Sequence, residues 1–200
     1  MEYMNRGDLR HVLAHTTSPA NWPWSAKLDV AHSVAQALFY LHSQQMIHRD
    51  LKSRNVLLDS KKGTKLADFG TSKQHVYEGD SMTAGVGTFR WMAPEMLLFQ
   101  PYSNAVDVYS FGVLLSELAT HTLPYADLAS GSDEASIARS VIYEHLRPSF
   151  GFTCPLWVQE LGLRCMVQEP QARPNVTEIM YCLSFNASNY GDRTPQAIYF

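Results

Sequence analysis

The sequence is poor in cysteine, in charge of one sign and in long apolar runs, and each scarcity argues against a class of protein. Its three cysteines, Cys154, Cys165 and Cys182, are an odd number at spacings that suit neither a disulfide framework nor a zinc site. The net charge of −3, with acidic and basic residues interspersed, predicts no nucleic-acid partner. No apolar run is long enough to cross a bilayer, and the first residues do not form a signal peptide. The composition therefore predicts a globular cytoplasmic protein.

The chain has enough apolar residues for one domain with a substantial core. It has 200 residues, of which 46% are hydrophobic. The clearest expected helix covers residues 25–44, where apolar side chains recur every three or four positions. Residues 107–118 are apolar on nearly every side, which is typical of a helix buried in a core. Shorter helices are expected over 136–144, 156–161 and 176–183.

A hairpin is expected in one place. Two short strand-like pieces, 56–59 and 64–67, are joined by a turn-rich linker and predict a small hairpin. Near the start of the chain, Asp8 could cap a short helix. Residues 184–200 lack periodicity, and we expect them to form an irregular tail. The elements predict a mainly helical α+β fold with one hairpin.

The most informative stretch is residues 48–55, His-Arg-Asp-Leu-Lys-Ser-Arg-Asn. A cluster of charges is usually a solvated surface, but this one lies between an apolar helix and an apolar strand. Asp-Phe-Gly follows at 68–70, and Met-Ala-Pro-Glu at 92–95. In this order the three motifs resemble the catalytic loop, the metal-binding motif and the end of the activation segment of protein kinases.

The residues of two motifs indicate which group of protein kinases the sequence resembles. Residues 87–95, Gly-Thr-Phe-Arg-Trp-Met-Ala-Pro-Glu, together with residues 48–55, look most like the tyrosine-kinase-like group of protein kinases. Most members of that group phosphorylate Ser and Thr. Thr88 and Lys52 resemble the arrangement in which a hydroxyl ties the substrate-binding loop to the catalytic residues. The resemblance therefore implies a serine/threonine kinase, with tyrosine as the alternative acceptor.

The resemblance also assigns roles to four polar residues. Asp50 would accept the proton of the attacking hydroxyl, and Lys52 would steady the transferred phosphoryl group. Asn55 and Asp68 would bind the Mg²⁺ that accompanies the phosphates of ATP. ATP and a protein substrate are the implied partners.

Residues 1–9 look like the hinge of a kinase running into a short helix. In the family, hinge backbone groups hydrogen-bond the edge of adenine. The resemblance gives this role to the carbonyl of Glu2 and to the amide and carbonyl of Met4. Leu9 would lie beneath the adenine ring, and Leu57 would also contact the nucleotide.

Residues 71–88 are polar and lack periodicity, as expected of a surface loop. The resemblance makes this stretch the activation segment. Ser81 and Thr83 are the first candidates for phosphorylation by an upstream kinase, and Thr71 and Ser72 are the second. The charge of Arg49 would receive that phosphate.

Three further contacts follow from the resemblance. Asp107 would be buried at the start of its helix and would accept hydrogen bonds from backbone amides of the catalytic loop. Glu95 would pair with Arg173. Phe69 would pack against His48.

The resemblance covers residues 1–183, hinge plus C-lobe, and leaves 184–200 as a C-terminal tail. A Gly-rich loop, a Val-Ala-Ile-Lys strand and a helix C glutamate are not found in the sequence. We therefore expect the N-terminal β-lobe to be absent, and these residues alone to be inactive. Because the catalytic residues are intact, a catalytic lobe is favoured. The alternative is a non-catalytic kinase-like lobe that acts as a binding or scaffold module.

Overall fold

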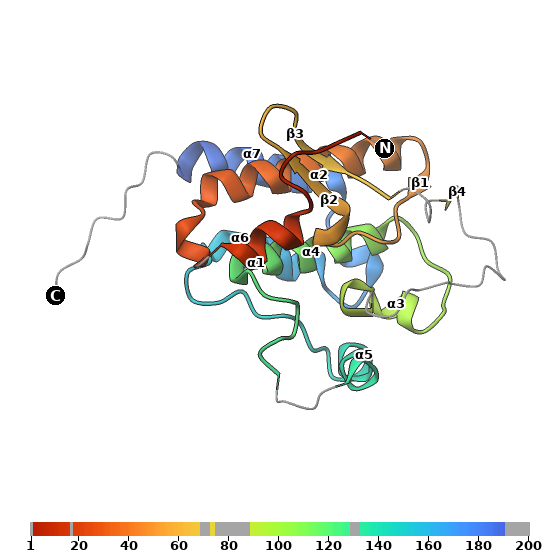
Figure 1. Ribbon diagram of the computed structural model, residues 1–200. Coiled ribbons are helices and arrows are strands. Elements are labelled where there is room, and N and C mark those ends of the chain that lie inside the picture. Colours follow the sequence, from red (N-terminus) through yellow and green to blue (C-terminus); the bar gives the residue numbers. More distant parts are fainter. Residues whose placement is uncertain (1, 17, 69–72, 75–88, 129–132, 191–200) are drawn as a thin grey trace.

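The computed structural model describes residues 2–16, 18–68, 73–74, 89–128 and 133–190. This part of the chain is mainly helical, with two small pairs of antiparallel strands (Figure 1). Its helices are α1 (Leu9–His15), α2 (Trp24–Ser43), α3 (Pro94–Leu97), α4 (Ala105–Thr120), α5 (Glu134–Tyr143), α6 (Leu156–Cys165) and α7 (Val176–Tyr190). Its strands are β1 (Met46–Ile47), β2 (Val56–Asp59), β3 (Gly63–Leu66) and β4 (Lys73–Gln74). The expected α+β class is confirmed.

Helix α4 is the centre of the molecule. Every residue from Val106 to Ala119 is buried, which confirms the helix expected from the all-round apolar pattern. α6 packs closely against α4, while α2 lies beside α7 on another side of the core (Figure 1). Gly112 permits the α4–α6 approach, since a Cβ at that position would lie 2.7 Å from the carbonyl oxygen of Gly162. The close contact of α4 with α6 leaves no room for a side chain at position 112.

The expected hairpin is present. β2 pairs with β3 in a register that places Val56 opposite Leu66 and Asp59 opposite Gly63. The Gly63 backbone has a φ of 75°, a conformation that favours glycine. The second strand pair, β1 with β4, was not predicted, because each strand has only two residues and gives no detectable alternation.

The N-terminal segment is attached to this hairpin. Arg6 donates its amide to the Leu58 carbonyl at 3.0 Å, and the Leu58 amide donates to the Gly7 carbonyl at 2.9 Å. Asp8 then caps α1 by accepting a hydrogen bond from the His11 amide at 2.9 Å, as the sequence predicted. The expected hinge segment is thus held beside the strand that follows the catalytic loop.

The end of α7 differs from the prediction. The helix continues to Tyr190, whereas an irregular tail was expected from Ser184 onward. Local contacts stabilise the added turns: Tyr181 stacks on Phe185 with ring centroids 6.1 Å apart, and the Asn186 side chain donates to the Cys182 carbonyl at 2.8 Å. These contacts link positions four residues apart without an apolar stripe, so periodicity did not reveal them.

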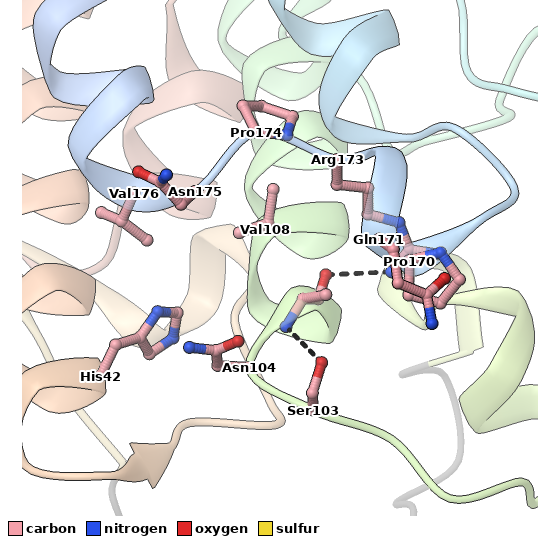
Figure 2. Close-up of a pocket in the computed structure, with 11 residues that line it drawn as sticks. His42, Ser103, Asn104, Val108, Pro170, Gln171, Arg173, Pro174, Asn175 and Val176 are labelled. Carbon is pink, nitrogen blue, oxygen red and sulfur yellow. Dashed lines mark hydrogen bonds between the residues drawn. The ribbon is translucent and has the colours of Figure 1, made fainter.

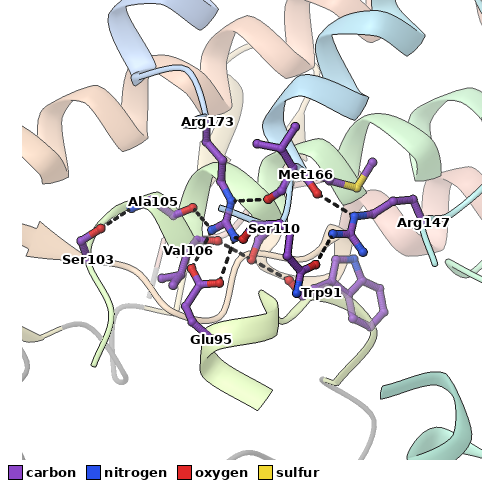
Figure 3. A network of polar contacts seen from close by, with 11 residues as sticks. Trp91, Glu95, Ser103, Ala105, Val106, Ser110, Arg147, Met166 and Arg173 are labelled. Atoms are coloured by element: carbon purple, nitrogen blue, oxygen red, sulfur yellow. Dashed lines mark hydrogen bonds and ion pairs between the residues drawn. The ribbon is translucent and has the colours of Figure 1, made fainter. Parts of the chain in front are cut away.

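A buried ion pair joins α3 to the segment that precedes α7 (Figure 3). The Arg173 guanidinium binds both carboxylate oxygens of Glu95, at 2.6 and 2.8 Å, as the resemblance implied. The same guanidinium also donates to the Ala105 carbonyl at 3.0 Å and lies 5.1 Å from the centre of the Tyr109 ring. Arg147 approaches the same ring at 5.3 Å. The start of α3, which carries the Met-Ala-Pro-Glu motif, is therefore fastened to the core.

Within the described part of the chain, no helix has both the length and the hydropathy needed to cross a membrane.

Candidate active site

Asp107, in the first turn of α4, fixes the start of residues 48–55, which we call the catalytic loop. Its carboxylate accepts the His48 amide at 2.9 Å and the Arg49 amide at 2.8 Å, as expected. His42 Nε2 lies 2.9 Å from the same carboxylate. The side chain of Asp107 is fully buried, and these bonds are what make the buried charge tolerable.

The contact of His42 with Asp107 was not predicted from the sequence. A histidine six residues before the loop gives no signal of its own, since its partner lies 65 positions away. It extends the polar network of the loop into α2.

Asp50, Lys52 and Asn55 come together in the catalytic loop. Lys52 Nζ lies 2.8 Å from each carboxylate oxygen of Asp50. The Asn55 side-chain amide donates to the Asp50 carbonyl oxygen at 2.7 Å and to its carboxylate at 2.9 Å. The three side chains are partly or mostly buried, so one carboxylate is held by a cation and an amide at the edge of the core.

Asp68 lies directly after the hairpin. The preceding residue, Ala67, donates its amide to the Asn55 carbonyl at 2.8 Å and accepts a hydrogen bond from His48 Nε2 at 3.1 Å. Asp68 itself is exposed, and its φ of 66° is uncommon for a residue other than glycine. Arg49 has a similar φ of 70°. Five other described residues besides glycine also have positive φ, so this conformation does not by itself mark the site.

The donor set of Asn55 and Asp68 is suited to Mg²⁺. The Asn55 amide nitrogen is taken up by Asp50, which leaves its carbonyl oxygen as the group that could face a cation. Asp68 adds an exposed carboxylate, and hard oxygen donors of this kind are those that Mg²⁺ prefers. Among the described residues there is no cluster of three or more His, Cys, Asp or Glu side chains that could hold a metal alone. A site of this kind would depend on substrate phosphates for further ligands.

The expected nucleotide-binding residues lie close to the hairpin. Met4 is buried, and its carbonyl accepts the Gly7 amide at 3.1 Å. Glu2 forms an ion pair with Lys62 at 3.0 Å and another with Lys65; the hydrogen bond from Lys65 and then that from Lys62 lower the pKa of its carboxyl.

Leu57 and Leu9 have different surroundings. Leu57, in β2, is half-buried and can still contact a ligand. Leu9 is completely buried in the core, so the expectation that it lies open beneath adenine is wrong: α1 turns its first apolar residue inward.

Several expectations concern residues that lie outside the described part of the chain. These are the packing of Phe69 on His48, the hydroxyl of Thr88, and the candidate phosphorylation sites Ser81, Thr83, Thr71 and Ser72. Arg49, the proposed phosphate acceptor, is half-buried and donates to the Tyr102 hydroxyl at 3.2 Å.

Two neighbouring cavities have volumes of about 250 and 420 Å³, and Figure 2 shows the residues that line the smaller one. Both are lined by His42, Asn104, Asn175 and Val176. Neither is lined by a residue of the catalytic loop, so these cavities are not the expected nucleotide site. One lining residue, His42, is bonded to Asp107, which in turn binds the loop.

Glu117, near the end of α4, is a second buried acid that contacts the loop. It accepts the Ser53 hydroxyl at 2.6 Å, the Ser53 amide at 3.3 Å and the Trp91 indole at 2.7 Å. Burial raises the pKa of this carboxyl to about 7, although these hydrogen bonds and the charge of Arg10 oppose the shift. Sequence reasoning missed Glu117, because an acid inside an apolar helix gives no sign of its distant partners.

Comparison with known proteins agrees with the motifs and the fold. The family model described as protein tyrosine and serine/threonine kinase matches residues 1–183. The chain is 38% identical to the serine/threonine/tyrosine-protein kinase HT1 of Arabidopsis thaliana, over 91% of this chain and 45% of that protein. It is 37% identical to the serine/threonine-protein kinase STY17 of the same plant, over 96% of this chain and 32% of that protein.

A further relative is the mitogen-activated protein kinase kinase kinase 13-A of Xenopus laevis, 36% identical over the whole of this chain and 20% of that protein. The chain spans less than half the length of each of these relatives. These matches show that the chain belongs to the protein kinase family. They confirm the resemblance to its tyrosine-kinase-like group and the kinase C-lobe-like fold.

Proposed function

We propose that the protein containing this chain is a serine/threonine protein kinase, which transfers the γ-phosphoryl group of ATP to hydroxyl groups of proteins. One observation carries the proposal: a single carboxylate, that of Asp50, is held by Lys52 and Asn55 at 2.7–2.9 Å. Asp107 fixes the start of the loop that carries Asp50 to the core. If Asp50 and Lys52 formed only a surface ion pair, such an attachment would not be needed.

The arrangement divides the work of phosphoryl transfer among the side chains. Asp50 accepts the proton of the substrate hydroxyl as its oxygen attacks the γ-phosphorus, and ADP departs with the electrons of the broken bond. Lys52, which forms an ion pair with Asp50, would stabilise negative charge on the transferred group. Asn55 and Asp68 would hold Mg²⁺, which neutralises phosphate charge when bound.

ATP is the proposed cofactor together with Mg²⁺, since the family generally uses both. The backbone of Glu2 and Met4 would bind the edge of adenine, and the half-buried side chain of Leu57 would contact the nucleotide. The attachment of this segment to the hairpin supports the proposal, because it holds the hinge near the catalytic loop.

Regulation and location are further proposals. An upstream kinase would phosphorylate Ser81 or Thr83, and Arg49 would bind the phosphate, since its backbone is already fixed by Asp107. A cytoplasmic location is supported by the three cysteines, all of which are free thiols, as is usual where glutathione keeps thiols reduced.

The identity of the acceptor tests the proposed class. The full-length protein would be incubated with Mg²⁺, labelled ATP and three matched peptide pools whose only hydroxyl is Ser, Thr or Tyr. We expect label in the Ser and Thr pools. Label confined to the Tyr pool would contradict the proposed acceptor, and a folded protein that labels none would favour the scaffold alternative.

A further inference from the structure

Glu117 joins two segments that are far apart in sequence. Ser53 directly follows Lys52 in the catalytic loop, and Trp91 lies four residues before Glu95, at the end of the activation segment. Both donate to the carboxylate of Glu117, which has no exposed surface. The Trp91 carbonyl also accepts a hydrogen bond from the Ser110 hydroxyl at 2.8 Å (Figure 3). The indole and the backbone carbonyl of Trp91 are therefore both hydrogen-bonded to side chains of α4.

The position of Glu117 on α4 complements that of Asp107. Asp107 binds the start of the catalytic loop, at His48 and Arg49, and Glu117 binds it at Ser53. At a rise of 1.5 Å per residue, the two acids are about 15 Å apart along the helix. One helix thus spans the loop and holds it at two points, with Asp50 between them.

The carboxyl of Glu117 can take up a proton without losing its partners. The Ser53 hydroxyl can reverse and accept a bond from the protonated oxygen, while the Ser53 amide and the Trp91 indole can only donate and stay on the other oxygen. The contacts then lose the added strength of a charged acceptor, which roughly doubles a hydrogen bond. Burial places the pKa of this carboxyl at about 7, so both forms are populated near neutral pH.

Among the described residues, the one charge that shifts the pKa of this carboxyl is that of Arg10. Arg10 of α1 lowers the pKa of Glu117 by its charge, and its guanidinium donates to the His121 carbonyl at 3.3 Å. The catalytic loop and the described residues around Trp91 contribute hydrogen bonds from Ser53 and Trp91.

We propose that Glu117 is a positioning residue that couples the catalytic loop to the end of the activation segment, and that gaining or losing one proton changes how firmly it holds Trp91. The structural part of this inference stands alone. Its effect on catalysis rests on the proposed function.

The indole N–H of Trp91 reports the proton directly. In the full-length protein labelled with ¹⁵N-tryptophan, the Trp91 signal, assigned by its loss in Trp91→Phe, should shift with a midpoint near pH 7. In Glu117→Gln, a neutral residue of the same shape, the signal should not move between pH 5.5 and 8.5. In Ser53→Ala the midpoint should rise, because a bond that lowers the pKa is lost. A Trp91 signal that is flat in the wild type, or that titrates equally in Glu117→Gln, would overturn the proposal.

Kinetics test the catalytic part separately. Glu117→Gln should flatten the dependence of kcat/KM on pH between 6 and 8 and raise KM for the peptide about two- to fivefold, with KM for ATP nearly unchanged. Equal changes for both substrates, or a pH profile like that of the wild type, would contradict a positioning role. If the wild type transfers no phosphate, the proposed function fails, whereas the indole titration still decides whether Glu117 carries the proton.

Discussion

Asp107 and Glu117 are both fully buried acids on one helix, and they differ in what satisfies them. Asp107 accepts two backbone amides of the catalytic loop and a bond from His42. Glu117 accepts one amide, one hydroxyl and one indole. For Glu117, burial raises the pKa of the carboxyl, and its hydrogen bonds oppose that shift only in part.

The first prediction at this scale concerns the pH dependence of stability. The pKa of Glu117 rises from an ordinary 4.5 to about 7 on folding, so the folded state binds this proton more tightly than the unfolded chain. The resulting stabilisation is complete below about pH 4.5 and is lost as the pH rises through about 7. The loss is about 3 kcal/mol. Urea unfolding should show that the free energy of unfolding of the wild type falls by this amount, relative to that of Glu117→Gln, as the pH rises from about 4.5 to above 7.

The comparison with Glu117→Gln is needed because His121 acts in the opposite direction. Burial lowers the pKa of His121 from 6.5 to about 4, so its contribution to stability is lost as the pH falls through that range. In the wild type the two effects partly cancel between pH 4.5 and 6.5, whereas in the difference between the two proteins His121 drops out. A difference that is constant with pH would show that Glu117 has an ordinary pKa.

The second residue-scale prediction concerns the ion pair of Arg173 and Glu95. Arg173→Ala leaves a buried carboxylate without its bidentate partner and should lower the free energy of unfolding by about 3–5 kcal/mol. Glu2→Gln, which breaks an exposed pair with Lys62 and Lys65, should leave it nearly unchanged. Denaturant titrations of both variants check the contrast, and equal losses would contradict the importance of burial.

At the scale of elements, periodicity predicted the parts that bury an apolar face over several turns. The expected helix over 25–44 is α2, the expected all-apolar helix lies within α4, and the hairpin is β2–β3. The β1–β4 pair and the last turns of α7 were not predictable this way. The β1–β4 pair has only two residues in each strand. The last turns of α7 depend on side-chain contacts such as that of Tyr181 with Phe185.

The packing of α4 on α6 gives the element-scale prediction. Gly112→Ala would place a methyl group 2.7 Å from both the Gly162 carbonyl oxygen and the Met166 side chain. Although alanine favours helix, overpacking should lower the free energy of unfolding by about 1–3 kcal/mol. Gln36→Ala, on the exposed face of α2, controls for helix propensity and should not be destabilising. A Gly112→Ala protein as stable as the wild type would show that the two helices can separate freely.

At the scale of the whole molecule, the candidate site combines segments from separate parts of the sequence. Motif order and spacing predicted which residues of the catalytic loop meet, because Asp50, Lys52 and Asn55 are close in the chain. They also predicted the contact of Glu95 with Arg173, 78 positions away, but only through resemblance to a family. The roles of His42 and Glu117 depend on how α2 and α4 face the loop, and no local pattern encodes that.

The most direct test of the central claim is the rate of phosphoryl transfer by the full-length protein with Asp50 intact and with Asp50→Asn. Removing the proton acceptor should lower kcat by about 10²- to 10⁴-fold, while ATP binding persists. Asp29→Asn, which neutralises an exposed acid on α2, should retain wild-type turnover. A wild-type rate in Asp50→Asn would contradict the assignment of Asp50, and with it the mechanism proposed for this chain.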